Sequence, residues 1–250
     1  MMAADGVKKV VSETLNKGLD KAASVSRPVV LDHIERCRQA RPDASPAEVI
    51  KALGRHFTAA TAATGTATGA TAAVPGVTLP ASLALGLGDA TAFTSVAALY
   101  VFALAEIHDV PINDLERRRT LLLGILLGDA GVDAVRKVAG RTGPHWARQF
   151  VKTVPIEAIR KVNRVLGPNF VTKYGTKQGV LVLGKQVPLG IGAAIGGFGN
   201  AAFARFTIRS AKRAFGPPPE EWPSSLVPEP SASGPFAASS DPMPEAASAS

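Results

Sequence analysis

The chain has 250 residues, of which 46% are hydrophobic and 19% are charged, and its formal net charge is +8. That length is enough to bury a substantial core in one or two domains. The single cysteine, Cys37, excludes an internal disulfide and fits a reducing compartment. The N-terminus has no apolar signal core, so we do not expect a secreted protein.

The charges are unevenly distributed along the chain. Residues 136–185 contain eleven Lys or Arg and one acidic residue, Glu157, whereas residues 217–250 contain five acidic residues and no basic one. A basic region attracts phosphate, whether in a lipid headgroup or in nucleic acid. A solvated cationic face that binds nothing is the alternative interpretation.

Amphipathic helices are predicted in the N-terminal segment, residues 1–44. Apolar residues recur at helical spacing over 6–24 and from Val29 to about Gln39. Ser45, Pro46 and Glu48 then have the residue types of the N-cap, first and third positions of a helix. We expect a helical domain over residues 45–215 to begin there.

The stretch from Phe57 to Ala105 contains one charged residue, Asp89, and is interrupted at Pro75. Because proline lacks a backbone donor, this pattern predicts two apolar helices, the second from Leu79 to about His108. At that helix end we expect His108 to interact favourably with the dipole. The uncharged run Ala90–Ala105 would be about 24 Å long, against a hydrocarbon core of ~30 Å. A firm single membrane span is therefore not expected.

Further helices are predicted after Asn113, read as an N-cap, and over an apolar face that runs from Trp146 to a stop at Gly167-Pro168. A second apolar hairpin with a proline break, at Pro188, leads into a segment with five glycines between 190 and 199. Each interior glycine costs a helix about 0.8–1 kcal/mol, so the glycine stripe predicts close approach to another helix or to lipid. The stripe consists of Gly192, Gly196 and Gly199.

Asp89 and Asn200 follow Pro75 and Pro188 at similar spacing, which suggests a weak internal repeat. Each is either a capping or locally buried polar group or part of a polar contact across packed hairpins. From Gly216 the chain is rich in proline, serine and alanine, so we expect a disordered acidic tail over 216–250 that is dispensable for folding. The fold class predicted is an all-α multi-helix bundle with two Gly/Ala-rich hairpins.

No catalytic or cofactor-binding constellation is predicted. Residues 179–185 match G-x-x-x-x-G-K, but Gln186 stands where a phosphate-binding loop needs Ser or Thr. The four histidines are scattered without metal-ligand spacing, and Cys37 has no partner in the sequence. We therefore expect no metal, no cofactor and no enzymatic activity.

Two motifs resemble the bacterial EcsC family. The first runs from Val74-Pro75-Gly76 through Leu-Gly-Asp89-Ala-Thr-Ala-Phe to Ala-Leu-Tyr-Val-Phe-Ala-Leu-Ala-Glu106. The second, residues 183–200, is similar to Gly-Lys-x-x-Pro-x-x-Gly-x-x-x-Gly-x-x-x-Asn, with one residue fewer between Pro188 and Gly190. The likeness covers about residues 45–215. It implies association with the membrane or with transport and secretion machinery, and it brings no active site.

The expected function is that of a non-enzymatic, membrane-associated helical protein, peripheral or partly inserting. It would lie on the cytoplasmic side of the cell membrane or in the cytoplasm, with an anionic membrane surface, a membrane transporter or a second copy as partner. No nucleic-acid partner is expected, since aromatic residues are few in the basic region. A soluble adaptor for an acidic protein and an inducible membrane-perturbing defence protein are the alternatives. The residues expected to contact the anionic surface are Arg148, Lys152, Arg160, Lys161 and Arg164.

Overall fold

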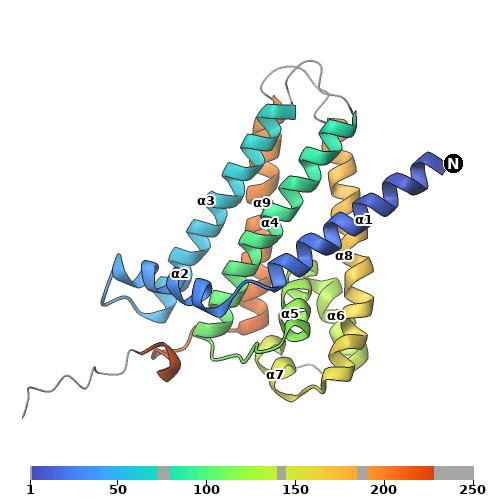
Figure 1. Ribbon diagram of the computed structural model, residues 1–250. Coiled ribbons are helices and arrows are strands. Elements are labelled where there is room, and N and C mark those ends of the chain that lie inside the picture. Colours follow the sequence, from blue (N-terminus) through green and yellow to red (C-terminus); the bar gives the residue numbers. More distant parts are fainter. Residues whose placement is uncertain (1, 73–78, 140–144, 185–190, 228–250) are drawn as a thin grey trace, which may run out of the picture.

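The structure, a computed structural model, describes residues 2–72, 79–139, 145–184 and 191–227. Side chains are described over 9–65, 87–138, 145–149, 153–173 and 199–227. Within these residues the protein is all-α, with nine α-helices, one short 3-10 helix and no strand (Figure 1). The predicted proline breaks, Pro75 and Pro188, lie outside the described residues.

The helices follow one another with short connections. They are α1 Met2–Ala23, α2 Arg27–Gln39, α3 Pro46–Ala72, α4 Leu79–Ile107, α5 Leu115–Leu127, α6 Asp129–Ala139, α7 Trp146–Thr153, α8 Ile156–Gly184 and α9 Ile191–Phe215, with the 3-10 helix η1 at Ser224–Leu226.

Local side-chain chemistry accounts for two of the helix starts. At α3, the backbone amide of Ser45 donates to Glu48 (3.0 Å) and the amide of Glu48 donates to the Ser45 hydroxyl (3.4 Å), which confirms the predicted capping box. At α5 the N-cap is Asp114 rather than Asn113, because the Asp114 carboxylate accepts from the amide of Arg117 (2.8 Å).

The predicted stop at Gly167-Pro168 is wrong, because α8 continues through Pro168 to Gly184. A proline inside a helix removes one hydrogen bond and crowds the preceding turn, at a cost of about 3 kcal/mol. Tertiary packing offsets this cost: Leu166 and Phe170 are fully buried on either side of the proline. The continuous helix also makes residues 179–184 helical, so they do not form a phosphate-binding loop.

Helix α4 is the centre of the fold. Nearly every residue from Ala97 to Ile107 is buried, and α1, α2, α3, α5, α8 and α9 all pack against it (Figure 1). A helix that is apolar all around is stable in water only when other helices cover all of its sides. Other helices thus cover most of the predicted apolar helix over residues 87–107, whose side chains are described.

The long helices α3, α4, α8 and α9 pack along one another. Helix α3 packs most extensively along α9, while α4 contacts both α3 and α8. Helices far apart in the sequence therefore lie side by side in the bundle (Figure 1).

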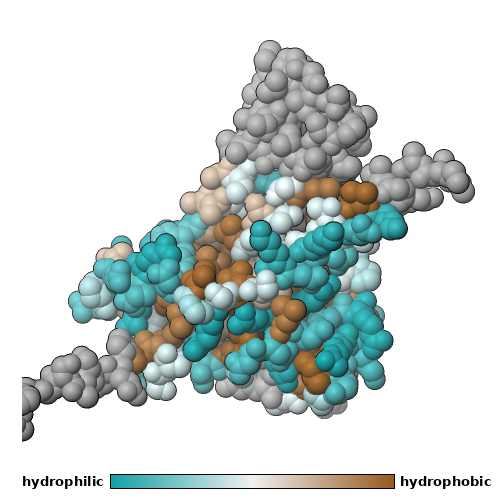
Figure 2. Space-filling model, viewed as in Figure 1, coloured by the Kyte–Doolittle hydropathy of each residue, from teal (hydrophilic) through white to brown (hydrophobic). Residues whose placement is uncertain are grey.

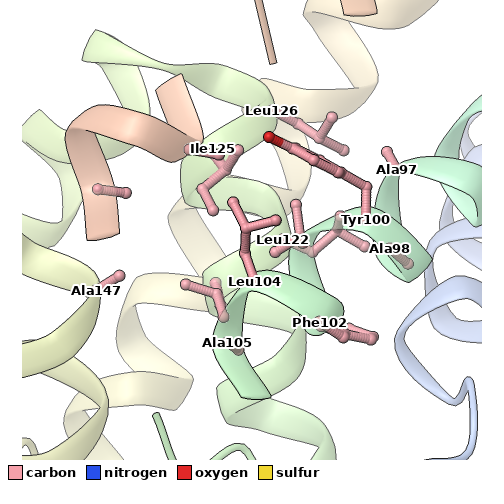
Figure 3. Close-up of a cluster of buried hydrophobic side chains, with 14 of the residues drawn as sticks. Ala97, Ala98, Tyr100, Phe102, Leu104, Ala105, Leu122, Ile125, Leu126 and Ala147 are labelled. Carbon is pink, nitrogen blue, oxygen red and sulfur yellow. The ribbon is translucent and has the colours of Figure 1, made fainter. Parts of the chain in front are cut away.

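Large and small side chains alternate where α4 meets α5. Figure 3 shows Tyr100 reaching from α4 toward Ile125 and Leu126 of α5, with Ala97 and Ala98 beside it on its own helix. The Tyr100 ring also stacks on Phe57 of α3, with centroids 5.0 Å apart. Burial raises the pKa of the Tyr100 hydroxyl, so this side chain acts as a neutral core residue.

Two glycines of α5 and α6 allow their backbones to touch. A Cβ at Gly131 would lie 2.4 Å from the carbonyl oxygen of Gly124, and a Cβ at Gly124 would meet Trp146 at 2.5 Å. Gly199 differs, since a Cβ there would meet nothing within 4 Å. The prediction of close contact is therefore wrong for Gly199, and the surroundings of Gly192 and Gly196 lie outside the described side chains.

The chain does not leave the body at Gly216, as the sequence analysis expects. Arg38 of α2 donates to the Leu226 carbonyl (2.8 Å), and its guanidinium lies over the Trp222 ring, 4.5 Å from the centroid. Trp222 Nε1 donates to the Ala44 carbonyl (3.3 Å). These contacts hold the proline-rich segment 217–227 against α2 and the α2–α3 turn. Residues 228–250 lie outside the described part.

The docked segment gives a stability prediction. Truncation after Val227 is expected to leave the unfolding midpoint unchanged, whereas truncation after Phe215 removes the Trp222 and Leu226 contacts. Half-burying an aromatic and an aliphatic side chain contributes about 2 kcal/mol, which is about 4–8 °C for a chain of this size. Thermal unfolding followed by circular dichroism measures both truncations, and equal midpoints would show that the segment does not pack.

Gly199 and Gly131 give a second prediction, because replacing each by alanine should change the free energy of unfolding in opposite directions. Gly199→Ala is expected to stabilise the protein by up to about 1 kcal/mol, because alanine is the better helix former and open space surrounds the site. Gly131→Ala is expected to destabilise it by about 1–3 kcal/mol, because the methyl group collides with the α5 backbone. Urea unfolding of the two variants tests this, and stabilisation by both would contradict the close α5–α6 contact.

Candidate functional site

Two buried polar residues meet in the middle of the apolar helices. Asn200 of α9 donates through Nδ2 to both carboxylate oxygens of Asp89 on α4, at 3.0 and 3.2 Å. Asn200 is 2% exposed and Asp89 is 6% exposed. The structure therefore places side by side the two polar residues that follow the two proline breaks at similar spacing.

This pair constrains how the helices pack. A buried carboxylate is costly unless it accepts hydrogen bonds, so a sliding of α9 along α4 would separate the donor from its acceptor. Apolar contacts alone are tolerant of such shifts. The Asp89–Asn200 contact is thus a positioning interaction within the bundle.

A second polar feature is a groove of about 660 Å³ between α1, α5 and α8. Three arginines line it, Arg119 from α5 and Arg160 and Arg164 from α8. The one carboxylate in the lining belongs to Glu116. The other lining residues are small, polar or apolar: Ser12, Asn16, Asn163, Gly167, Pro168, Val171 and Thr172. We call this the basic groove.

Hydrogen bonds hold the walls of the basic groove. Asn163 donates to the Glu116 carboxylate (2.6 Å) and to its carbonyl (3.0 Å), and accepts from the Thr120 hydroxyl (2.7 Å). Arg119 donates to Asn16 (3.3 Å) and pairs with Asp20, which ties α5 to α1. The Arg119 Nε is buried without a hydrogen-bond partner among the described residues. The groove therefore combines fixed walls with guanidinium groups that suit an anion.

The predicted anion-contact residues separate in the structure. Arg160 and Arg164 line the basic groove, and Lys161 is exposed between them in the sequence on α8. Figure 2 shows hydrophilic residues over α1 and over the part of the molecule where α5 and α8 lie. The side chain of Lys152 lies outside the described residues. Ser12, Asn16 and Arg119 of the groove were missed, because only the tertiary fold brings α1 and α5 beside α8.

Arg148 contacts protein groups instead of presenting a free charge. It donates through Nη2 to His108 Nδ1 (2.5 Å) and to the Pro217 carbonyl (2.7 Å). Burial, followed by the charge of Arg148, lowers the pKa of His108 to about 4. The imidazole is therefore neutral at pH 7, so His108 brings no positive charge to the end of α4. Its ring stacks on Phe215, with centroids 5.1 Å apart.

The fold also assembles a group of potential metal ligands that the sequence analysis did not identify. One ligand atom each of His33, Cys37 and His56 lies within 4.8 Å of the others. The first two are four residues apart on α2, which places them on one helix face. That spacing was a visible signal, but the third member comes from α3.

One helix segment in the described part, Leu87–Ile107, is long and apolar enough to cross a membrane by length and composition. Its most apolar window is 67% buried within the bundle. The core helix of a water-soluble bundle has the same properties, so this segment does not by itself indicate a membrane span.

Comparison of the chain with protein-family models, with curated proteins and with solved structures gives no match. The resemblance to the EcsC family stays a prediction.

The buried pair is tested by a double-mutant cycle. Asn200→Leu removes the donor and leaves the Asp89 carboxylate buried, so we expect a loss of about 1–3 kcal/mol in the free energy of unfolding. Adding Asp89→Leu should restore part of that loss, because two apolar partners leave no polar group unsatisfied. Urea unfolding of both single variants and the double variant measures the coupling. Simple additivity would show that the two side chains do not depend on each other.

Proposed function

We propose that this protein is a non-enzymatic peripheral membrane protein whose basic groove binds the headgroups of anionic lipids. Its place would be the cytoplasmic side of the cell membrane. The observation that carries the proposal is the convergence of Arg119, Arg160 and Arg164 on one groove, where Asn163 already engages the Glu116 carboxylate.

The groove has the guanidinium groups and the volume to hold a phosphate group. Guanidinium groups bind phosphate oxygens through paired hydrogen bonds. A groove of about 660 Å³ has room for a headgroup as well as for several ordered waters. The exposed Lys161 adds charge next to the groove without entering the lining.

Charge supplies the attraction in this proposal. Each Lys or Arg near an anionic surface contributes about 1 kcal/mol, so a few such residues give reversible attachment. Because α4 is covered by other helices, partial insertion would require it to leave its contacts. The proposal therefore favours peripheral binding, and it agrees with the membrane association that the EcsC resemblance implies.

A soluble adaptor for an acidic protein is the second candidate. The burial of Leu87–Ile107 favours it, since the most apolar helix is already satisfied without lipid. The same groove would then bind acidic side chains. The lipid proposal predicts that the protein binds anionic vesicles, whereas the adaptor proposal predicts that it does not.

Vesicle flotation of the intact chain tests the lipid proposal. Binding is expected to rise with the anionic lipid fraction and to weaken as the Debye length falls from about 10 Å at 0.1 M salt to about 3 Å at 1 M. Replacing Arg160, Lys161 and Arg164 by Gln should weaken binding by about 3 kcal/mol at low salt, which is more than a hundredfold.

The chain offers a matched control on another helix. Arg205, Arg209 and Lys212 are exposed on α9, and replacing them by Gln changes the net charge by the same amount. This control should bind vesicles almost as tightly as the parent. Equal losses in both triple variants would show that net charge rather than the groove is responsible. A parent that never floats with anionic vesicles would leave the adaptor as the better explanation.

A further inference from the structure

The packing of α2 on α3 brings two imidazoles and one thiol close together near the surface. His33 and Cys37 come from consecutive turns of α2, and His56 comes from α3. One ligand atom of each lies within 4.8 Å of the other two. Cys37 is 5% exposed, His33 is half-buried and His56 is exposed, so the group has a buried floor and an open side.

One separation between ligand atoms matches that in a metal site. Cys37 Sγ lies 3.5 Å from His56 Nδ1. A tetrahedral zinc ion with a Zn–S bond of about 2.3 Å and a Zn–N bond of about 2.0–2.1 Å holds sulfur and nitrogen about 3.5 Å apart. The two imidazole rings are 6.1 Å apart and tilted by 52°, so they are not stacked against each other.

Burial shifts the pKa values of two of the three groups, His33 and Cys37. Burial is the largest cause of the lowered pKa of His33. Burial raises the pKa of the Cys37 thiol. A thiol of this kind is a poor nucleophile at neutral pH, but a bound metal replaces its proton directly.

We propose that His33, Cys37 and His56 form a binding site for one divalent transition-metal ion of the zinc class. Two imidazoles and one thiolate are a ligand set that zinc, cobalt and copper accept. The exposed side at His56 leaves the fourth position to water. The site joins α2 to α3, and it is separate from the basic groove in its residues and in its helices.

Cobalt binding to the full-length, metal-stripped protein under reducing conditions tests the proposal. We expect one equivalent of Co²⁺ to give a thiolate-to-cobalt charge-transfer band and the visible spectrum of four-coordinate cobalt, and Zn²⁺ to displace it. His56→Gln should weaken binding by more than the roughly 10–100-fold that loss of an outer partner costs a metal site. Because His56 is exposed, this variant keeps the fold, which circular dichroism verifies.

Two further variants assign the ligands. Cys37→Ser should abolish the charge-transfer band. His145→Asn is the matched control, since it removes a histidine outside the cluster and asparagine tolerates the positive φ of 66° at that position; it should bind cobalt as the parent does. The proposal is overturned if the parent shows no band, if the band survives in Cys37→Ser, or if His145→Asn weakens binding as much as His56→Gln.

Discussion

The need to cover α4 on all sides determines most of the structure. Asp89 is its one charged residue before Glu106, and its other side chains offer no polar face to water. Burying a large aliphatic or aromatic side chain contributes about 1.5–3 kcal/mol. The helices around α4 each supply a part of its cover, and many of their charged residues are exposed. The basic groove is one result of this arrangement, because it forms where α1, α5 and α8 meet on the outer side of the core.

The sequence predicted features that depend on neighbouring residues, and it did not predict features that depend on contacts between helices. The Ser45–Glu48 capping box is a pattern of four residues, and the structure confirms it. Pro168 shows the limit, since tertiary contacts of Leu166 and Phe170 hold a helix together through a residue that normally ends one. The segment 217–227 has the composition of a disordered tail, but it docks through the Trp222 and Leu226 side chains and through hydrogen bonds of Trp222 Nε1 and of the Leu226 and Pro217 carbonyls.

The candidate sites were predictable to different degrees. The density of positive charge on α8 was visible in the sequence, and Arg160 and Arg164 do line a groove. Arg119 was not predictable as their neighbour, because its place depends on how α5 packs on α8. His33, Cys37 and His56 show the same limit, as their cluster exists only through the α2–α3 contact. A cluster whose residues lie on two helices cannot be predicted in full from the residue spacing along one of them.

The docking of the C-terminal segment on the α2–α3 turn also fixes the place where the described part of the chain ends. Val227 follows η1 on the α2 side of the bundle, whereas α8 lies on the other side in the same view (Figure 1). Whatever is attached beyond Val227 therefore starts away from the basic groove. The Trp222 contact therefore separates this attachment point from the anion-binding residues proposed on α8.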